Sequence, residues 1–260
     1  MKNMKIYFPR LNTKRRRLFL TLMTCILIPD IISALCFLAF NCASPDSKLM
    51  KSIQQAVEVE SQQMKDMSTE INKLKKNYQD LNKELSQEQN FKEGLKFVLA
   101  SEGGVSDDAA DSGGLTNLGI THSEYAQYRA SHGLPSRSVR EISLLEARDI
   151  YKHIYWTNSG CGVTPRRIAI SCFDWQVNSN RGFSTLQQVL GVDVDGIPGH
   201  QTYNELNSWL SKPKNETVIL HNYFGIREAD YRRWGVGSQS VFLTGWLNRS
   251  RALKTYLQVP

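Results

Sequence analysis

Apolar residues follow three different patterns along the chain. An unbroken apolar run covers residues 18–40, and residues 47–91 then place apolar side chains at alternating three- and four-residue steps. Beyond residue 92 the apolar positions recur with the 3.6-residue period of amphipathic helices. We also expect a short hairpin near 113–121. The helical segments that the period predicts are 91–103, 122–132, 141–157, 165–179, 183–190, 199–211, 214–233 and 241–257.

The run over 18–40 predicts a single transmembrane helix. Its 23 residues would extend about 35 Å, more than the roughly 30 Å of a bilayer core. Residues 1–17 carry seven Lys and Arg and no acid, so the positive-inside rule keeps this tail cytoplasmic and exports the rest. We therefore expect a single-pass protein of a bacterial inner membrane with its globular part in the periplasm. A cleaved signal peptide is the alternative, and Asp30 within the run leaves release from the membrane open.

The three-four spacing of residues 47–91 predicts a coiled coil. Apolar side chains from Met50 to Leu85 keep the heptad, with only Glu60 interrupting the seam, and the segment contains no Pro or Gly. A parallel homodimer is the simplest partner arrangement. A lone solvated helix is the alternative, but its apolar seam would then face water. The roughly 45 residues would extend about 65 Å as a stalk.

Charge and cysteine content exclude several classes of protein. The net charge is +7, but residues 93–260 carry seventeen basic and sixteen acidic side chains, so the excess lies in the tail and does not indicate a nucleic-acid surface. The histidines are scattered and no Cys-x-x-Cys occurs, so we expect no metal and no cofactor. Cys161 and Cys172 fit either a disulfide bridge in an exported domain or two buried thiols.

Candidate chemistry begins at Glu102. The apolar positions Leu95, Val98 and Leu99 predict a helix that ends at the glycine pair after Glu102. Partial desolvation in a last helical turn can hold the proton of a glutamate to higher pH. Nine residues later Asp111 opens the turn Asp-Ser-Gly-Gly, which would bring a second carboxylate towards the first. Paired carboxylates in unlike surroundings suit glycoside hydrolysis, although either feature alone is common in proteins without this activity.

This stretch resembles the signature of glycoside hydrolase family 108, bacterial and phage muramidases that cut peptidoglycan. The resemblance rests on Glu-Gly-Gly, an Asp-rich turn and Asp-x-Gly-Gly-x-Thr-x-x-Gly-Ile-Thr. The order of residues is also similar to phage-type lysozymes, which use an acid, a base and a residue that positions water. The resemblance implies these roles for Glu102, Asp111 and Thr116.

Three later motifs extend the resemblance to about residue 260. Residues 173–179 resemble the Asp-x-x-x-Asn helix of the family, 186–199 resemble a peptidoglycan-binding module, and 242–249 match its last helix. They imply a mainly α fold: a lysozyme-like α+β catalytic domain over 92–180 and a helical, peptidoglycan-binding-like subdomain over 181–260.

A glycan cleft also needs flat apolar faces and hydrogen-bonding groups. Tyr125, Trp156 and Trp175 are candidate sugar platforms, as are Tyr155 and Trp246, although each ring would also suit a core. Asn178 and Asp174 are candidate partners for an N-acetyl or hydroxyl group, although Asp174 would equally suit an ion pair with an arginine.

We therefore expect a membrane-anchored N-acetylmuramidase that cuts the glycan strands of peptidoglycan. Glu102 would donate a proton to the leaving oxygen, and Asp111 would activate water or stabilise the developing charge. The separation of the two carboxyl groups would decide between inversion and retention. A lytic transglycosylase, which needs Glu102 but not Asp111, and a non-catalytic peptidoglycan-binding tether remain alternatives. Lysis, wall remodelling and secretion are equally compatible settings.

Overall fold

The structure is a computed structural model that describes residues 47–102, 105 and 114–260. The predicted tail 1–17, the predicted transmembrane helix 18–40 and Asp111 lie outside these residues. Within the described part, no helix is both long and apolar enough to cross a bilayer. The described residues divide into two units, 47–76 and 77–260.

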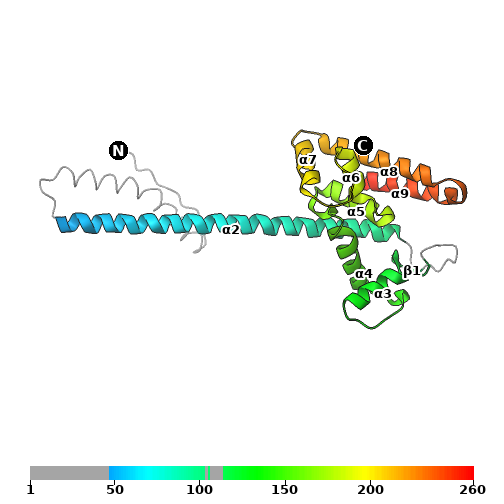
Figure 1. Cartoon of the computed structure of the whole chain (residues 1–260), viewed down its shortest axis with the longest axis horizontal. Coiled ribbons are helices and arrows are strands. Elements are labelled where there is room, and N and C mark those ends of the chain that lie inside the picture. The colour runs from blue at the N-terminus through cyan, green and yellow to red at the C-terminus, as the bar shows by residue number, and fades with distance from the viewer. Residues whose placement is uncertain (1–46, 103–104, 106–113) are drawn as a thin grey trace, which may run out of the picture. The chain divides into compact units, whose positions relative to one another are not determined.

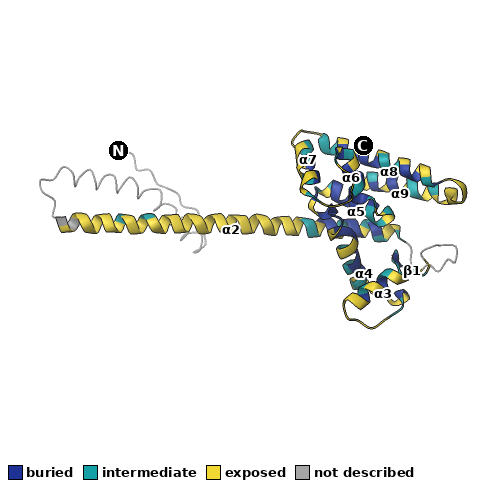
Figure 2. Cartoon of the chain, in the orientation of Figure 1, coloured by how far each residue is buried: buried dark blue, intermediate teal, exposed yellow. Residues whose placement is uncertain are grey.

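The predicted coiled-coil segment forms the first part of one long helix, α2 (Ser47–Ser101). The apolar seam of this helix is open to solvent in the single chain: Ile71 is 50% exposed, Leu74 58% and Leu85 64% (Figure 2). Leaving so much apolar surface in water is unfavourable. The seam is thus exposed in the single chain, and its pairing with a partner helix in a coiled coil remains a prediction.

The last turns of α2 enter the core of the second unit. Phe91 and Val98 are fully buried and Leu95 is 7% exposed, while Glu88 forms ion pairs with Arg148 and Lys152 at 2.6 and 2.7 Å. The sequence patterns predicted a stalk that ends at residue 91 and a separate helix that begins there. The structure instead continues one helix to Ser101, and residues 88–91 already belong to the globular fold.

Helices dominate the second unit, which agrees with the prediction of a mainly α fold (Figure 1). Among the described residues of this unit, the sheet is an antiparallel hairpin with two residues in each strand, in which Thr116 pairs with Thr121 and Asn117 with Ile120. The elements after α2 are β1 (Thr116–Asn117), β2 (Ile120–Thr121), α3 (His122–Ser131), η1 (Val139–Glu141), α4 (Leu144–Ile150), the π-helical η2 (Tyr151–Thr157), η3 (Cys161–Val163), α5 (Arg166–Ser179), α6 (Gly182–Leu190), α7 (His200–Leu210), α8 (Asn215–Trp234), η4 (Gly237–Gln239) and α9 (Ser240–Tyr256).

Helix α5 lies between two hydrophobic cores. Ala169 and Phe173 pack with the end of α2, the hairpin and η2, whereas Ile170 and Trp175 pack with α6, α8 and α9. Every residue from 168 to 175 is buried, as expected for a helix that is enclosed on all sides (Figure 2). Because α5 contributes to both cores, it can connect a group near α2 with a group on the C-terminal helices.

Cys161 and Cys172 form a disulfide bridge, which decides between the two states that the sequence left open. Their Cα atoms lie 5.5 Å apart, and the bridge ties η3 to the middle of α5. Both cysteines are fully buried.

Removing this bridge should destabilise the fold. Closing a loop of 11 residues is worth about 3 kcal/mol in the chain-entropy model, so Cys161→Ala/Cys172→Ala should melt roughly 6 to 12 °C lower in a protein of this size. Circular dichroism melts with and without a reductant provide the measurement. Reductant should lower the melting temperature of the wild type and leave that of the double variant unchanged; a reductant-insensitive wild type would contradict a stabilising bridge.

Candidate active site

Glu102 directly follows the last residue of α2, Ser101. Its backbone N–H donates to the Val98 carbonyl at 2.9 Å, so the helix still fixes where the side chain begins. The side chain is 22% exposed and rests against the hairpin turn, where a β-carbon added to Gly119 would lie 2.8 Å from Glu102 Cγ. Glu102 therefore lies at a boundary between core and solvent, as the sequence analysis expected.

The hairpin turn is held in place from two sides. Tyr151 Oη donates to the Leu118 carbonyl at 2.8 Å, and the Asn117 amide donates to the Val139 carbonyl at 3.2 Å. Gly119 has φ +73°, and a β-carbon there would also lie 2.6 Å from the Tyr151 hydroxyl. Burial, and then the nearby Glu102 carboxylate, raise the pKa of Tyr151, so its phenol stays neutral and remains a donor.

Glu102 is the outermost member of a chain of four charged side chains. Arg249 on α9 donates through Nη1 to Glu102 Oε1 at 2.6 Å, and through Nε and Nη2 to Asp174 Oδ1 at 3.0 and 2.8 Å. Arg227 on α8 forms an ion pair with Asp174 Oδ2 at 2.6 Å. We call Arg227, Asp174, Arg249 and Glu102 the ion-pair chain. The sequence predicted partial desolvation for Glu102, but it did not predict this guanidinium partner.

The electrostatics of the ion-pair chain are balanced. Two positive and two negative groups give no net formal charge. Burial by itself would raise the pKa of Asp174, but the guanidinium groups of Arg227 and Arg249 outweigh it and lower that pKa below its ordinary value. Burial would likewise lower the pKa of Arg249, and the two carboxylates raise it instead. Asp174 therefore stays ionised and keeps binding both arginines.

The inner end of the ion-pair chain is fixed by aromatic neighbours. Arg227 Nη2 donates to the Tyr231 hydroxyl at 2.9 Å, and its guanidinium lies 5.0 Å from the Trp175 ring centroid. Arg227 is fully buried and Asp174 is 1% exposed, whereas Arg249 is 13% exposed. The exposed fraction thus rises along the chain from the core to Glu102.

Of the three residues expected to perform catalysis, the structure describes two. Thr116 lies on β1, three residues before the Gly119 that touches Glu102, and is partly exposed. Asp111 lies outside the described residues, so its assignment remains a prediction. Asn178 is exposed near the end of α5, where its side-chain amide donates to the Asp174 carbonyl at 2.7 Å; its role towards substrate also remains a prediction.

Burial argues against a substrate contact for the other four predicted residues. Asp174 is occupied by two arginines and cannot reach a sugar. Tyr125 is fully buried and its hydroxyl accepts from Arg129 and Arg137. Trp156, 3% exposed, packs against Phe91 and Phe173, and Trp175 is fully buried with its Nε1 donating to Thr185. The three aromatic side chains belong to the core, which was the alternative role that the sequence allowed for each of them.

One aromatic candidate keeps access to solvent. Trp246 on α9 is partly exposed and stacks against Phe242, which is 52% exposed. Both lie on the same side of α9 as Arg249, since residues at intervals of four and three share a helix face. Trp246 also stacks against Tyr231 and packs on the core of the C-terminal helices, so its role towards a sugar remains a prediction.

The sequence patterns gave no role in the site to Arg249, Arg227 or Tyr151. Arg249 is the last residue of the motif 242–249, so its position was noted without a role. It lies 147 positions from Glu102, and no local pattern predicts a contact over that separation. Within the described residues, no group of His, Cys, Asp or Glu side chains could hold a metal ion.

Comparison with known proteins supports the class that this site indicates. A family model described as Glycosyl hydrolase 108 matches residues 95–180, a stretch that contains Glu102, Asp111 and Thr116 and supports a glycoside hydrolase. Among solved structures, the chain is similar to that titled "Structure of Brucella abortus SagA", with 27% sequence identity and a TM-score of 0.55. The match covers 66% of this chain and 95% of that one. Among curated proteins, none matches.

Gly119→Ala should impair both the site and the fold. The new methyl group would meet Tyr151 Oη and Glu102 Cγ below 3.0 Å, and φ +73° is a conformation that side chains rarely adopt. We expect a loss of about 1–3 kcal/mol in stability and at least a tenfold loss, on the order of 1.4 kcal/mol, in glycoside hydrolase activity.

Gly133→Ala is the matched control, because Gly133 has φ +64° but an added methyl group would meet nothing within 4 Å. It should show the conformational cost in a thermal melt and keep its activity. Equal activity of the two variants per folded molecule would mean that the contact with Glu102 has no catalytic importance.

Proposed function

We propose that the protein is a peptidoglycan hydrolase, an N-acetylmuramidase that cuts the bond between N-acetylmuramic acid and N-acetylglucosamine. The observation that carries the proposal is the placement of Glu102: a partly exposed carboxylate, held by Arg249 and the hairpin, within the stretch that matches glycosyl hydrolase 108. A rigidly placed acid beside a solvent-accessible surface is what proton donation to a glycosidic oxygen requires.

The chemistry follows from the arrangement of Glu102. In the ion pair Glu102 is ionised and Arg249 binds Oε1; to act as the acid, the side chain first takes up a proton on Oε2 and then gives it to the leaving oxygen. Asp111 acts as the second carboxylate, and Thr116 on the hairpin holds the attacking water. A separation of about 6.5–9.5 Å between the two carboxyl groups would give inversion, and about 5–5.5 Å retention. A lytic transglycosylase and a wall-binding tether are the competing functions.

We further propose that the protein is anchored in a membrane and forms a homodimer. Residues 18–40 anchor the protein in the inner membrane of a bacterium with residues 1–17 in the cytoplasm, and the second unit acts on peptidoglycan from the periplasmic side. The disulfide bridge between Cys161 and Cys172 supports an oxidising compartment, because such bridges persist there. The open seam of α2 supports a parallel homodimer.

Glu102→Gln should abolish digestion of isolated peptidoglycan while the protein stays folded. The amide keeps the shape of the side chain but cannot donate its proton as an acid, so we expect a loss of at least about 10²-fold. A turbidity assay measures the rate. Retention of more than a tenth of the wild-type rate would remove Glu102 from its role.

Glu93→Gln is the matched control, because Glu93 is on the same helix and is also paired with an arginine, Arg166, away from Glu102. It should digest peptidoglycan at the wild-type rate. Mass spectrometry of the wild-type products separates the competing functions: reducing ends support hydrolysis, anhydro-sugar ends indicate a transglycosylase, and no products indicate a tether.

The dimer is tested with a fragment of residues 47–260. It should dimerise, and Ile71→Asp/Leu74→Asp should return it to a monomer by placing charge in the seam. Light scattering at tens of micromolar gives the mass. The control Asn72→Asp/Lys76→Asp changes residues outside the seam and should remain dimeric. A monomeric parent fragment would exclude a strong homodimer and favour a partner helix or a single extended helix.

A further inference from the structure

We propose that Arg249 is a positioning residue for Glu102, and that helix α9 thereby completes an active site whose acid directly follows α2. The inference rests on the proposed function and deepens it. It concerns a residue outside the stretch 95–180 that matches the glycosyl hydrolase model, so the C-terminal helices would supply part of the catalytic machinery as well as any binding surface.

Arg249 bridges Asp174 and Glu102. Two of its donors bind Asp174 and a third binds Glu102. A guanidinium is planar and presents its donors in a rigid fork, so fixing two of them fixes the direction of the third. The position of Glu102 Oε1 is therefore set from Asp174, in the middle of the core, rather than by the exposed end of α2 alone.

The buried ion pair of Asp174 with Arg227, to which Arg249 is attached, cannot easily move. Asp174 is 1% exposed and Arg227 is fully buried. Separating two buried charges would leave each without compensation, which is strongly unfavourable. Tyr231 and Trp175 further restrict Arg227. Helices α5, α8 and α9 thus hold one rigid support, and Glu102 is attached to its outer end.

A purely structural ion-pair cluster would have no reason to end at this carboxylate. The exposed fraction increases along the ion-pair chain, from 0% at Arg227 to 13% at Arg249 and 22% at Glu102. The only end that a substrate can approach is the residue assigned as the acid. A misplacement of a reacting group by about 1 Å can cost about 10²-fold in rate, so this attachment is worth a large effect.

The test compares Arg249→Ala and Arg249→Lys in the full-length protein with solubilised glycan strands as substrate. Arg249→Ala should lower kcat by about 10²-fold with KM changed less than about threefold, because the acid is misplaced and the glycan surface is intact. Arg249→Lys keeps the charge but has no fork, so it should recover less than about tenfold of the lost kcat.

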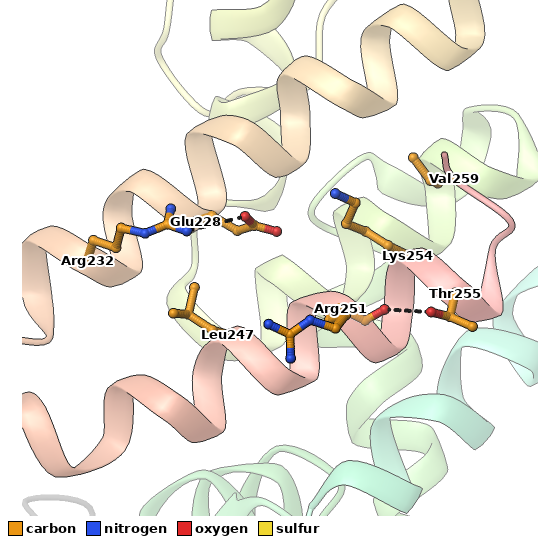
Figure 3. A pocket seen from close by; sticks show the side chains of 7 residues that line it. All are labelled: Glu228, Arg232, Leu247, Arg251, Lys254, Thr255 and Val259. Atoms are coloured by element: carbon orange, nitrogen blue, oxygen red, sulfur yellow. Dashed lines mark hydrogen bonds and ion pairs between the residues drawn. The ribbon is translucent and has the colours of Figure 1, made fainter.

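Chemical rescue separates positioning from folding. Guanidinium ion at tens of millimolar should restore kcat of Arg249→Ala at least about tenfold by refilling the space between Asp174 and Glu102, and methylammonium should restore less. Arg251→Ala is the control. Arg251 is exposed on the same helix, binds Asn248 and lines a groove of about 310 Å³ between α8 and α9 that contains no member of the ion-pair chain (Figure 3). It should keep wild-type kcat with and without guanidinium.

The outcomes separate this inference from the proposed function. Wild-type kcat in Arg249→Ala, or a loss that guanidinium does not restore and that follows the unfolded fraction in a thermal melt, would overturn the positioning role while an inactive Glu102→Gln left the proposed function intact. Full activity of Glu102→Gln, assayed in parallel, would overturn both. Loss in Arg249→Ala with rescue by guanidinium, and little effect in Arg251→Ala, supports the inference.

Discussion

The ion pairs of Asp174 are the constraint on which the site depends. This carboxylate is 1% exposed and would be costly to bury alone, but Arg227 and Arg249 compensate it from opposite oxygens. Because the two arginines come from α8 and α9 and the aspartate from α5, the interaction fixes three helices at one point. The orientation of Glu102 follows from that point through Arg249.

The two hydrophobic cores meet at α5, the helix that also carries Asp174. One side of α5 packs against the end of α2 and the hairpin, and the other packs against α6, α8 and α9. Gly94 allows the close approach on the first side, since a β-carbon there would lie 3.0 Å from Phe173. The acid at the end of α2 and the cation on α9 can therefore meet although they are far apart in sequence. A fragment meant to fold as the second unit alone must include the buried Phe91. It should therefore begin at residue 77 rather than at Glu93.

Local patterns predicted the helices and the position of Glu102, because periodicity and a glycine pair act over a few residues. They could not predict Arg249 at Glu102, since that contact depends on how α5, α8 and α9 pack. The same limit explains the aromatic assignments: composition shows that Trp156 and Trp175 are flat and apolar, but only the packing shows that their faces are covered. The sequence allowed either a sugar contact or an ion pair for Asp174, and its burial favours the ion pair.

The energetics of the ion-pair chain favour a functional reason for it. Replacing a buried ion pair by apolar side chains of similar volume is often neutral or stabilising by about 1–4 kcal/mol, so stability alone gives little reason to bury Arg227 and Asp174. An apolar core at this position would offer no directed donor at its surface. A charged core delivers one donor of Arg249 to one oxygen of Glu102 with a fixed geometry. The burial of charge in α5 and α8 is thus accounted for by the need to hold the carboxylate that directly follows α2.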